Sequence, residues 1–216
     1  MASAFGAEGN EAGVNGHGGG MRLDVLGELR AEDGELSGNV AAAGGGLYLE
    51  DLGEGGAAVF TGVEWTGNTA DDGGGAWVSH NAVSLLECGF HENHADDGGG
   101  GLWISSDGSL GLSEGTVFWD NTSAAAGGGL YLAAGELGCE GGTKTADGFL
   151  RNEAVEGGAV YLRDTEGTLS FTASSCDLGG DADDNLGGDV WTAADGGTSW
   201  SWGDDASFTC DREGCE

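Results

Sequence analysis

The sequence contains no proline, and only 6 of its 216 residues are lysine or arginine. The absence of proline excludes collagen-like and proline-rich chains, so the 48 glycines must serve tight turns or close backbone packing. With 38 acidic residues the net charge is −32, which repels phosphate backbones and anionic membrane surfaces. The composition therefore predicts no nucleic-acid binding and a solvated acidic surface.

Long apolar runs are also missing from the sequence. No apolar segment approaches the length that crosses a membrane, so we expect no transmembrane segment. Residues Met1 to Asn10 have neither the basic region nor the apolar region of a secretory signal. Because the first repeat is already under way at Asn10, we expect the chain to begin inside a longer protein, without that protein's export signal.

Cysteines are few, and none of the five forms a C-x-x-C pair, which removes support for a zinc ribbon or a thioredoxin-like site. Disulfides are the favoured interpretation, with Cys139 paired to Cys176, Cys210 paired to Cys215, and Cys88 left unpaired. Disulfides indicate an oxidising compartment. We therefore predict an extracellular or cell-surface location.

A repeat runs along the chain, and each copy has an asparagine, a glycine block and then an aliphatic, an aromatic and an aliphatic residue. The copies begin at Asn39, Asn68, Asn93, Asn121, Asn152 and Asn185, with spacings of 25 to 33 residues, and a degenerate first copy begins at Asn10. One spacing is about one solenoid turn, and no segment has a helical period. The repeat predicts an all-β fold, a right-handed parallel β-helix (β-solenoid) of about six to seven coils.

The repeat also predicts the domain organisation. We expect parallel β-helix repeats over residues 1–192 and a C-terminal capping segment over residues 193–216, where the pattern stops. Solenoids need such caps because an exposed terminal coil is an edge that recruits other chains. The N-terminal end shows no cap in the sequence, which leaves self-association end to end as an alternative.

Stacked coils place equivalent residues above one another at strand spacing, so the asparagine amides are expected to bridge neighbouring coils. In the strand after the glycines, alternation sends the aliphatic residues to the interior and the aromatic residue outward. The expected interior residues are Leu47, Leu49, Val78, Leu102, Ile104, Leu130, Leu132, Val160 and Leu162. The expected outward stripe is Tyr48, Trp77, Trp103, Tyr131, Tyr161 and Trp191, with Arg22 in the first coil.

This aromatic stripe supplies the candidate ligand-binding residues. An exposed row of aromatic rings can stack on the sugar rings of a glycan or pack against a protein surface. The alternative is a ladder that only stabilises the solenoid by cross-strand stacking.

Large apolar residues stand three positions before the asparagine in most copies, namely Leu36, Trp65, Phe90, Phe118 and Phe149. The pairing of F-x-x-N with a following G-G-hydrophobic element resembles the repeats of polymorphic outer membrane proteins and autotransporter passengers. The resemblance covers roughly Asn10 to Thr192, and it implies a β-helix at the bacterial cell surface.

Acidic pairs precede the glycines in two adjacent coils, Asp71-Asp72 and Asp96-Asp97. Stacked carboxylates repel each other unless a cation such as Ca²⁺ lies between them. A solvated acidic ridge is the favoured alternative, because alanines occupy the matching stretches of other coils.

Histidines cluster in one region, where His91 and His94 flank Asn93 and His80 precedes them, with Cys88 nearby. Their spacing fits no zinc motif, so surface histidines are the favoured interpretation and we predict no metal site there.

The sequence shows no catalytic constellation, because its few basic residues are scattered over different coils. We therefore predict no catalytic residues, and a non-catalytic extracellular or cell-surface module with a structural or adhesive role towards glycan or protein surfaces. A carbohydrate-active β-helix enzyme, either a glycoside hydrolase or a lyase, and a self-assembling extracellular filament subunit are the alternatives.

Overall fold

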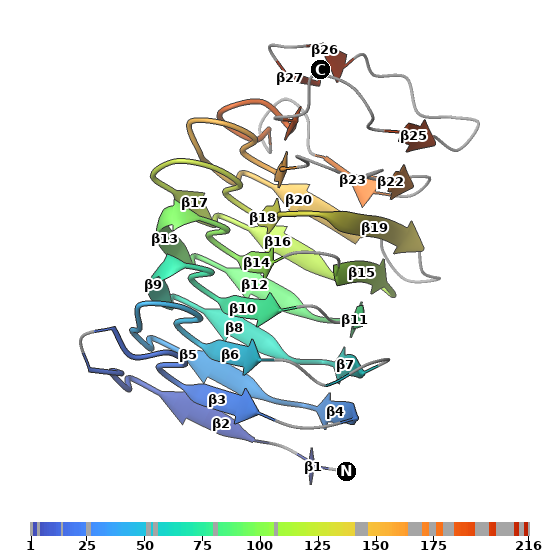
Figure 1. Cartoon of the computed structure of the whole chain (residues 1–216). Coiled ribbons are helices and arrows are strands. Elements are labelled where there is room, and N and C mark those ends of the chain that lie inside the picture. Colours follow the sequence, from blue (N-terminus) through green and yellow to red (C-terminus); the bar gives the residue numbers. More distant parts are fainter. Residues whose placement is uncertain are drawn as a thin grey trace.

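The computed structural model shows an all-β chain whose parallel strands stack into a β-solenoid of about five turns (Figure 1). It describes residues 2–3, 5–13, 15–24, 27–50, 53, 56–79, 82–105, 108–140, 147–163, 170–172, 176–178, 184–192, 199–201, 210–211 and 214–215. The predicted fold class is confirmed, because neighbouring repeats pair in parallel along almost their whole length.

Four sheets run along the solenoid, and each turn passes through sheets B, D and A in that order, with a strand of sheet C between B and D in three of the turns. Sheet B contains β2 (Gly6–Glu8), β5 (Glu35–Ser37), β8 (Glu64–Thr66), β12 (Gly89–His91), β16 (Val117–Trp119), β20 (Asp147–Leu150) and β23 (Cys176–Asp177). Sheet C contains β9 (Thr69–Asp72), β13 (His94–Gly98) and β17 (Thr122–Ser123). Sheet D contains β3 (Met21–Asp24), β6 (Leu47–Glu50), β10 (Ala76–Ser79), β14 (Leu102–Ser105), β18 (Leu130–Leu132), β21 (Val160–Leu162), β24 (Val190–Thr192), β26 (Cys210–Asp211) and β27 (Gly214–Cys215). Sheet A contains β1 (Ala2–Ser3), β4 (Glu28–Glu32), β7 (Ala57–Thr61), β11 (Ala82–Leu86), β15 (Gly108–Ser113), β19 (Gly135–Glu140), β22 (Ser170–Thr172) and β25 (Ser199–Ser201).

The number of turns is slightly lower than the six to seven coils expected. About five turns are complete, and the turns that begin at β20 and β23 are described only in part. At the C-terminal end the parallel pattern stops, because β27 pairs antiparallel with β24 and with β26. The predicted cap over residues 193–216 lies largely outside the described residues.

The interior is filled by the aliphatic residues that alternation predicted. Leu49, Ile104 and Leu130 have no exposed surface, and the other six predicted interior residues are at most 1% exposed. Period-two alternation in sheet A adds a second set, which includes Phe60, Leu85 and Leu112. Burial of this apolar surface is the main driving force for the fold.

A stack of large apolar side chains, the inner ladder, lines the inner face of sheet B. It consists of Leu36, Trp65, Phe90, Phe118 and Phe149, each at most 1% exposed. Ring centroids are 4.4 Å apart for Trp65 and Phe90, 4.5 Å for Phe90 and Phe118, and 4.7 Å for Phe118 and Phe149. These distances match the spacing of neighbouring strands, so the strand register imposes the stack.

The asparagines form the predicted ladder, and its geometry explains the F-x-x-N spacing. The Asn68 Nδ2 amide donates to Asn93 Oδ1 at 2.9 Å and also to the Leu36 carbonyl at 2.8 Å. Asn93 and Asn121 repeat both bonds one turn further on, with the carbonyls of Trp65 and Phe90 as acceptors. In these three turns the buried amide is therefore satisfied by the asparagine of the next turn and by the inner-ladder residue of the previous turn.

The glycine block forms a corner that admits no side chain. The first glycine is left-handed in every complete turn, with φ of 62° at Gly44 and 63° at Gly73, a region that glycine adopts without a steric penalty. The next two glycines lie against the backbone of the following turn, since a Cβ at Gly45 would be 2.4 Å from the Gly74 oxygen. The first glycine of the block is thus required by its left-handed conformation, and the next two are required because the backbone of the following turn leaves no room for a side chain.

Candidate functional site

The predicted aromatic stripe, the outer ladder, lies in register along sheet D. Tyr48 pairs with Trp77, Trp77 with Trp103, Trp103 with Tyr131, Tyr131 with Tyr161, and Tyr161 with Trp191. The rings of Trp103 and Tyr131 are 3.7 Å apart and almost parallel, and those of Tyr48 and Trp77 are 4.5 Å apart. The predicted ladder is therefore present as far as its side chains are described, which excludes that of Trp191.

The outer ladder is more covered than expected. Tyr48, Tyr131 and Tyr161 are 5%, 6% and 9% exposed, and burial raises the pKa of all three hydroxyls. The glycine corner packs beside them, since a Cβ at Gly98 would lie 2.7 Å from the Trp103 ring. The tyrosines of the outward stripe are therefore buried, and Tyr131 and Tyr161 form with Ala126 a second, smaller apolar cluster outside the main core.

The acidic pairs do not stack directly on each other. The register shifts between Ala95 and Gly98, so Gly98 rather than Asp97 pairs with Asp72. Burial, together with the charges of Asp97 and Asp71, raises the pKa of Asp72 to about 6. Within the described ranges, no group of three or more potential ligands is placed to hold a metal ion.

The histidines and Cys88 do not form one site. His94 Nδ1 lies 2.8 Å from Thr122 Oγ1, and His91 Nε2 lies 3.1 Å from Glu64 Oε2. Cys88 is 2% exposed inside the hydrophobic core, where burial raises the pKa of its thiol to about 11. His80 is outside the described residues.

A depression on the outer face of sheet B brings charged, polar and aromatic side chains together. Its volume is about 410 Å³, and it is lined by Thr66, His91, Glu92, Trp119, Asp120 and Arg151. Trp119 is 39% exposed, whereas Trp77 and Trp103 of the outer ladder are only partly exposed. Trp119 follows Phe118 of the inner ladder, so period-two alternation turns its ring outward.

Arg151 is held over the exposed indole. Its guanidinium carbon lies 4.9 Å from the centre of the Trp119 ring, and its Nε donates to Asp120 Oδ1 at 2.9 Å. A second guanidinium nitrogen contacts Asp120 Oδ2, so the pair is bidentate and its geometry is fixed. The depression therefore presents an oriented cation, a carboxylate and an aromatic surface together.

The backbone that carries three of the charged side chains is left-handed. Glu92, Asp120 and Arg151 have φ of 55°, 55° and 53°, and each directly precedes a ladder asparagine. Gly38 and Gly67 occupy the same position in earlier turns, with φ of 62° and 63°. Left-handed backbone is unfavourable for residues with a Cβ, so these charged residues stand where glycine would fit the turn better.

Gly89 leaves room for the histidine at the edge of the depression. A Cβ there would lie 2.0 Å from Glu64 Oε2 and 2.3 Å from His91 Nε2. The contact between Glu64 and His91 is therefore possible only because residue 89 is a glycine, which has no side chain. Sequence reasoning missed this site, although the replacement of glycine by a charged residue before Asn93, Asn121 and Asn152 was a visible signal.

Comparison with protein-family models, with curated proteins and with solved structures finds no match to this chain. In the ranges described above, no helix has the length and apolar character needed to cross a membrane.

Proposed function

We propose that this chain is a non-catalytic extracellular or cell-surface module that binds glycans through the depression around Trp119. The observation that carries the proposal is the exposed indole with the Arg151–Asp120 pair fixed beside it. An aromatic face packs on the apolar face of a sugar ring, and paired donors and acceptors bind neighbouring hydroxyls. The ladders behind the site make it rigid, which lowers the entropic cost of binding.

Two further observations support this proposal. Asp120 is ion-paired through both carboxylate oxygens, which favours a binding role over the general acid or nucleophile that a glycosidase needs. Cys139 is disulfide-bonded, as proteins of oxidising compartments often are. The F-x-x-N repeats resemble those of bacterial surface proteins, and this resemblance favours the same location.

The test is a glycan-array screen and a hydrolysis screen on the purified chain, each with and without calcium. We expect binding without product formation, and a loss of affinity of about 10- to 30-fold for Trp119→Ala, the size of a binding hot spot. Trp103→Ala is the matched control, because it removes an indole from the outer ladder and leaves the depression intact. Hydrolysis products would refute the non-catalytic role.

A second variant separates binding from folding. Arg151→Gly removes the cation from Trp119 and places glycine at a left-handed position, so it should weaken glycan binding without lowering the melting temperature. Loss of binding in Trp103→Ala but not in Trp119→Ala would move the site to the outer ladder. Calcium-dependent binding would point instead to the acidic residues near Asp72 and Asp97.

A further inference from the structure

The depression around Trp119 runs along the solenoid axis, across the strands of sheet B. In Figure 1, β8, β12, β16 and β20 follow one another along this axis. Thr66 pairs with His91 and His91 with Trp119, and Arg151 directly follows β20 in the next turn. Neighbouring strands are about 4.8 Å apart, so the lining residues extend over about 14 Å. A ligand that fills the depression is therefore longer than a single sugar ring.

One edge of the depression is formed by the positions that directly precede the ladder asparagines. In consecutive turns these positions hold Gly67, Glu92, Asp120 and Arg151. Each has a left-handed backbone, with φ between 53° and 63°. Equivalent positions of neighbouring turns are about 4.8 Å apart. The charges along this edge therefore lie close together, in the order neutral, negative, negative and positive.

The two carboxylates on this edge have different surroundings. The Arg151 guanidinium binds both oxygens of Asp120, so the charge of Asp120 is balanced. Glu92 is exposed, and no side chain of the described ranges forms an ion pair or a hydrogen bond with its carboxylate. Its neighbour on the side away from Asp120 is Gly67, where an added Cβ would have no other atom within 4 Å. The space beside Glu92 is therefore open, whereas the space beside Asp120 holds a guanidinium.

The histidine of the depression does not neutralise Glu92. The His91 Nε2 atom lies 3.1 Å from Glu64 Oε2, so the imidazole is engaged by a different carboxylate. The depression and its rim thus carry the carboxylates of Glu64, Glu92 and Asp120 but only one arginine. In a chain of net charge −32, this excess of negative charge repels uronic acids and sulfated sugars and attracts cations.

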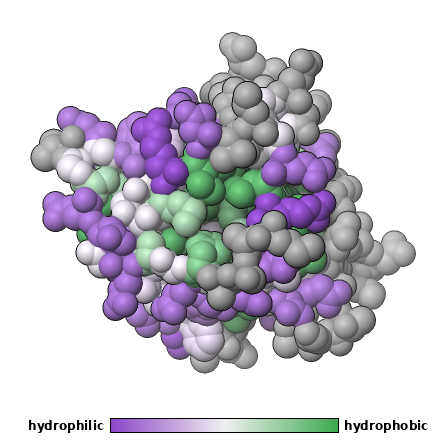
Figure 2. Space-filling view, turned by 90° about the horizontal axis from the view of Figure 1, so that it is seen from below, coloured by the Kyte–Doolittle hydropathy of each residue, from purple (hydrophilic) through white to green (hydrophobic). Residues whose placement is uncertain are grey.

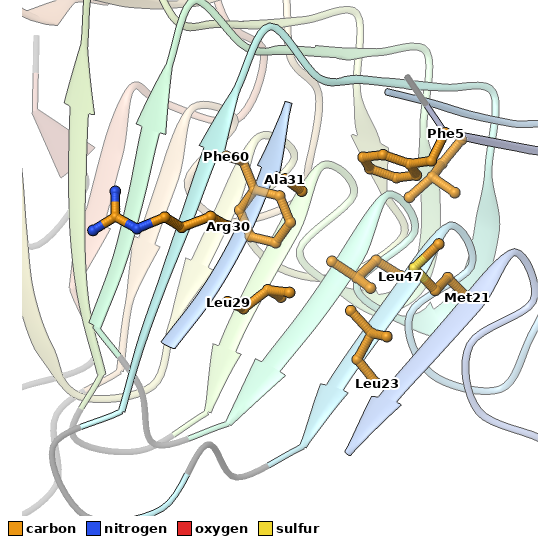
Figure 3. Close-up of a pocket in the computed structure, with 9 residues that line it drawn as sticks. Phe5, Met21, Leu23, Leu29, Arg30, Ala31, Leu47 and Phe60 are labelled. Carbon is orange, nitrogen blue, oxygen red and sulfur yellow. The ribbon is translucent and has the colours of Figure 1, made fainter. Parts of the chain in front are cut away.

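The hollow at the N-terminal end of the described chain has a different chemistry. It has a volume of about 250 Å³, and its apolar lining includes Phe5, Met21, Leu29 and Phe60. Figure 2 shows apolar residues in the middle of this face with hydrophilic residues around them. In Figure 3 the apolar side chains gather around the hollow, whereas the Arg30 guanidinium points away from them. The lining side chains include no carboxylate, hydroxyl or amide, so they offer no acceptor for a cation or for a sugar hydroxyl.

We propose that the depression binds an oligosaccharide with a positively charged amino group, which Glu92 accepts in the open space beside Gly67. This inference rests on the proposed glycan-binding function and names the class of sugar. A sugar ring of the same ligand packs on Trp119, in the turn next to Glu92. An ammonium group donates several hydrogen bonds, for which the Glu92 carboxylate and the Thr66 hydroxyl of the lining are acceptors. Asp120 keeps its pair with Arg151.

A lysine side chain on a protein partner carries the same charge as an amino sugar. The depression favours the sugar because it is concave and has a volume of about 410 Å³, which lies in the range of small-molecule sites. A stable protein interface instead covers about 800 Å² on each partner. The shape of the site therefore selects between two ligands that its charge does not distinguish.

The test compares tetrasaccharides of one β-1,4 linkage, built from glucose, glucosamine or glucuronic acid. Binding to the purified chain is measured by isothermal titration calorimetry at one slightly acidic pH, where the amino groups are protonated. We expect the glucosamine form to bind about fivefold more tightly than the glucose form, the upper range for an exposed ion pair. The glucuronic acid form should bind most weakly. Because the ligands share their linkage and length, their charge is the variable that separates them.

A change at Glu92 and a matched control locate the preference. Glu92→Gln should remove it, so that the glucosamine and glucose forms differ by less than about twofold. Glu114→Gln is the control, because it removes the same charge from another left-handed position, with φ of 57°, that does not line the depression. The control should keep the preference of about fivefold. Equal melting temperatures of the two variants would show that both are folded.

Several results would overturn the inference. Equal binding of the glucose and glucosamine forms, abolished for both by Trp119→Ala, would leave the glycan site in place and refute its preference for amino groups. Loss of the preference in Glu114→Gln as well would assign it to the net charge of the chain. Tightest binding of the glucuronic acid form, or tighter binding of a lysine-rich peptide than of any sugar, would refute it too. No binding of any of these ligands, together with an empty glycan array, would refute the proposed function as well.

Discussion

Two aromatic ladders run along this solenoid with similar spacing but in different surroundings. The inner ladder lies in the core, and Phe118 has no exposed surface. The outer ladder lies on the far side of sheet D, where Trp103 is partly exposed and Tyr131 accepts a hydrogen bond from Arg163. The strand register therefore creates the stacking in both ladders. The residues around each ring determine whether it is fully buried or also contacts solvent and charged groups.

The largest expected effect is in the inner ladder. Phe118→Ala should lower the free energy of unfolding by about 3–5 kcal/mol, because it leaves a closed cavity between Phe90 and Phe149. Denaturant titration followed by fluorescence measures this loss. A loss of less than about 1 kcal/mol would show that the neighbouring rings close the gap.

The matched change in the outer ladder should cost less. Trp103→Ala removes a ring that stacks on Tyr131 at 3.7 Å, but solvent can enter the space, so we expect a loss of about 1–3 kcal/mol. The same titration compares it with Phe118→Ala. If both changes cost the same, the distinction between the two ladders is wrong.

Charge at the rim of the outer ladder should make stability depend on pH. The pKa of Asp72 is raised from 3.8 to about 6 in the folded chain, so the folded state binds this proton more tightly and stability falls as pH rises from about 4 to 6. Asp72→Asn should therefore raise Tm at pH 7 by about 2–4 °C, or ~1 kcal/mol after screening by solvent.

The gain from Asp72→Asn should vanish at pH 4, where the aspartate is already largely protonated in the fold. Asp96→Asn, at an exposed position of the same corner, is the control for removal of one charge. Thermal unfolding at both pH values checks the prediction, and an equal gain at pH 4 and pH 7 would contradict it.

The smallest expected effect concerns the indole in the inner ladder. Trp65 Nε1 is buried without a hydrogen-bond partner among the described residues, which costs about 1–3 kcal/mol. Trp65→Phe removes this donor but also some packing volume, so the free energy of unfolding should change by less than about 1 kcal/mol. A loss similar to that of Phe118→Ala would mean that the indole has a hidden partner.

The sequence was sufficient for the fold because glycine and asparagine mark the same points of every turn. The positions of Asn68 and Gly73 determine which residues stack, and alternation then places Val78 inside. The exposure of the outer ladder was not predictable, because the backbone at Gly98 packs beside its rings, a contact that the alternation within the strand does not specify.

The sites were less predictable than the fold for two physical reasons. The shift in register after Ala95 moves Asp97 away from the place that simple stacking gives it. The depression around Trp119 depends on side chains from four turns, and three of them, Glu92, Asp120 and Arg151, extend from left-handed turn positions. No local sequence pattern predicts that the residues lining this depression lie close together.

Burial of Cys88 has a practical consequence for the chain. Only the thiolate attacks disulfides and alkylating reagents, and with a pKa of about 11 this thiol stays protonated at neutral pH while the fold is closed. The unpaired cysteine therefore does not disturb the disulfide at Cys139 in the native state. Alkylation of Cys88 would proceed only when the core opens. The rate of its alkylation therefore reports how often the folded chain unfolds around it.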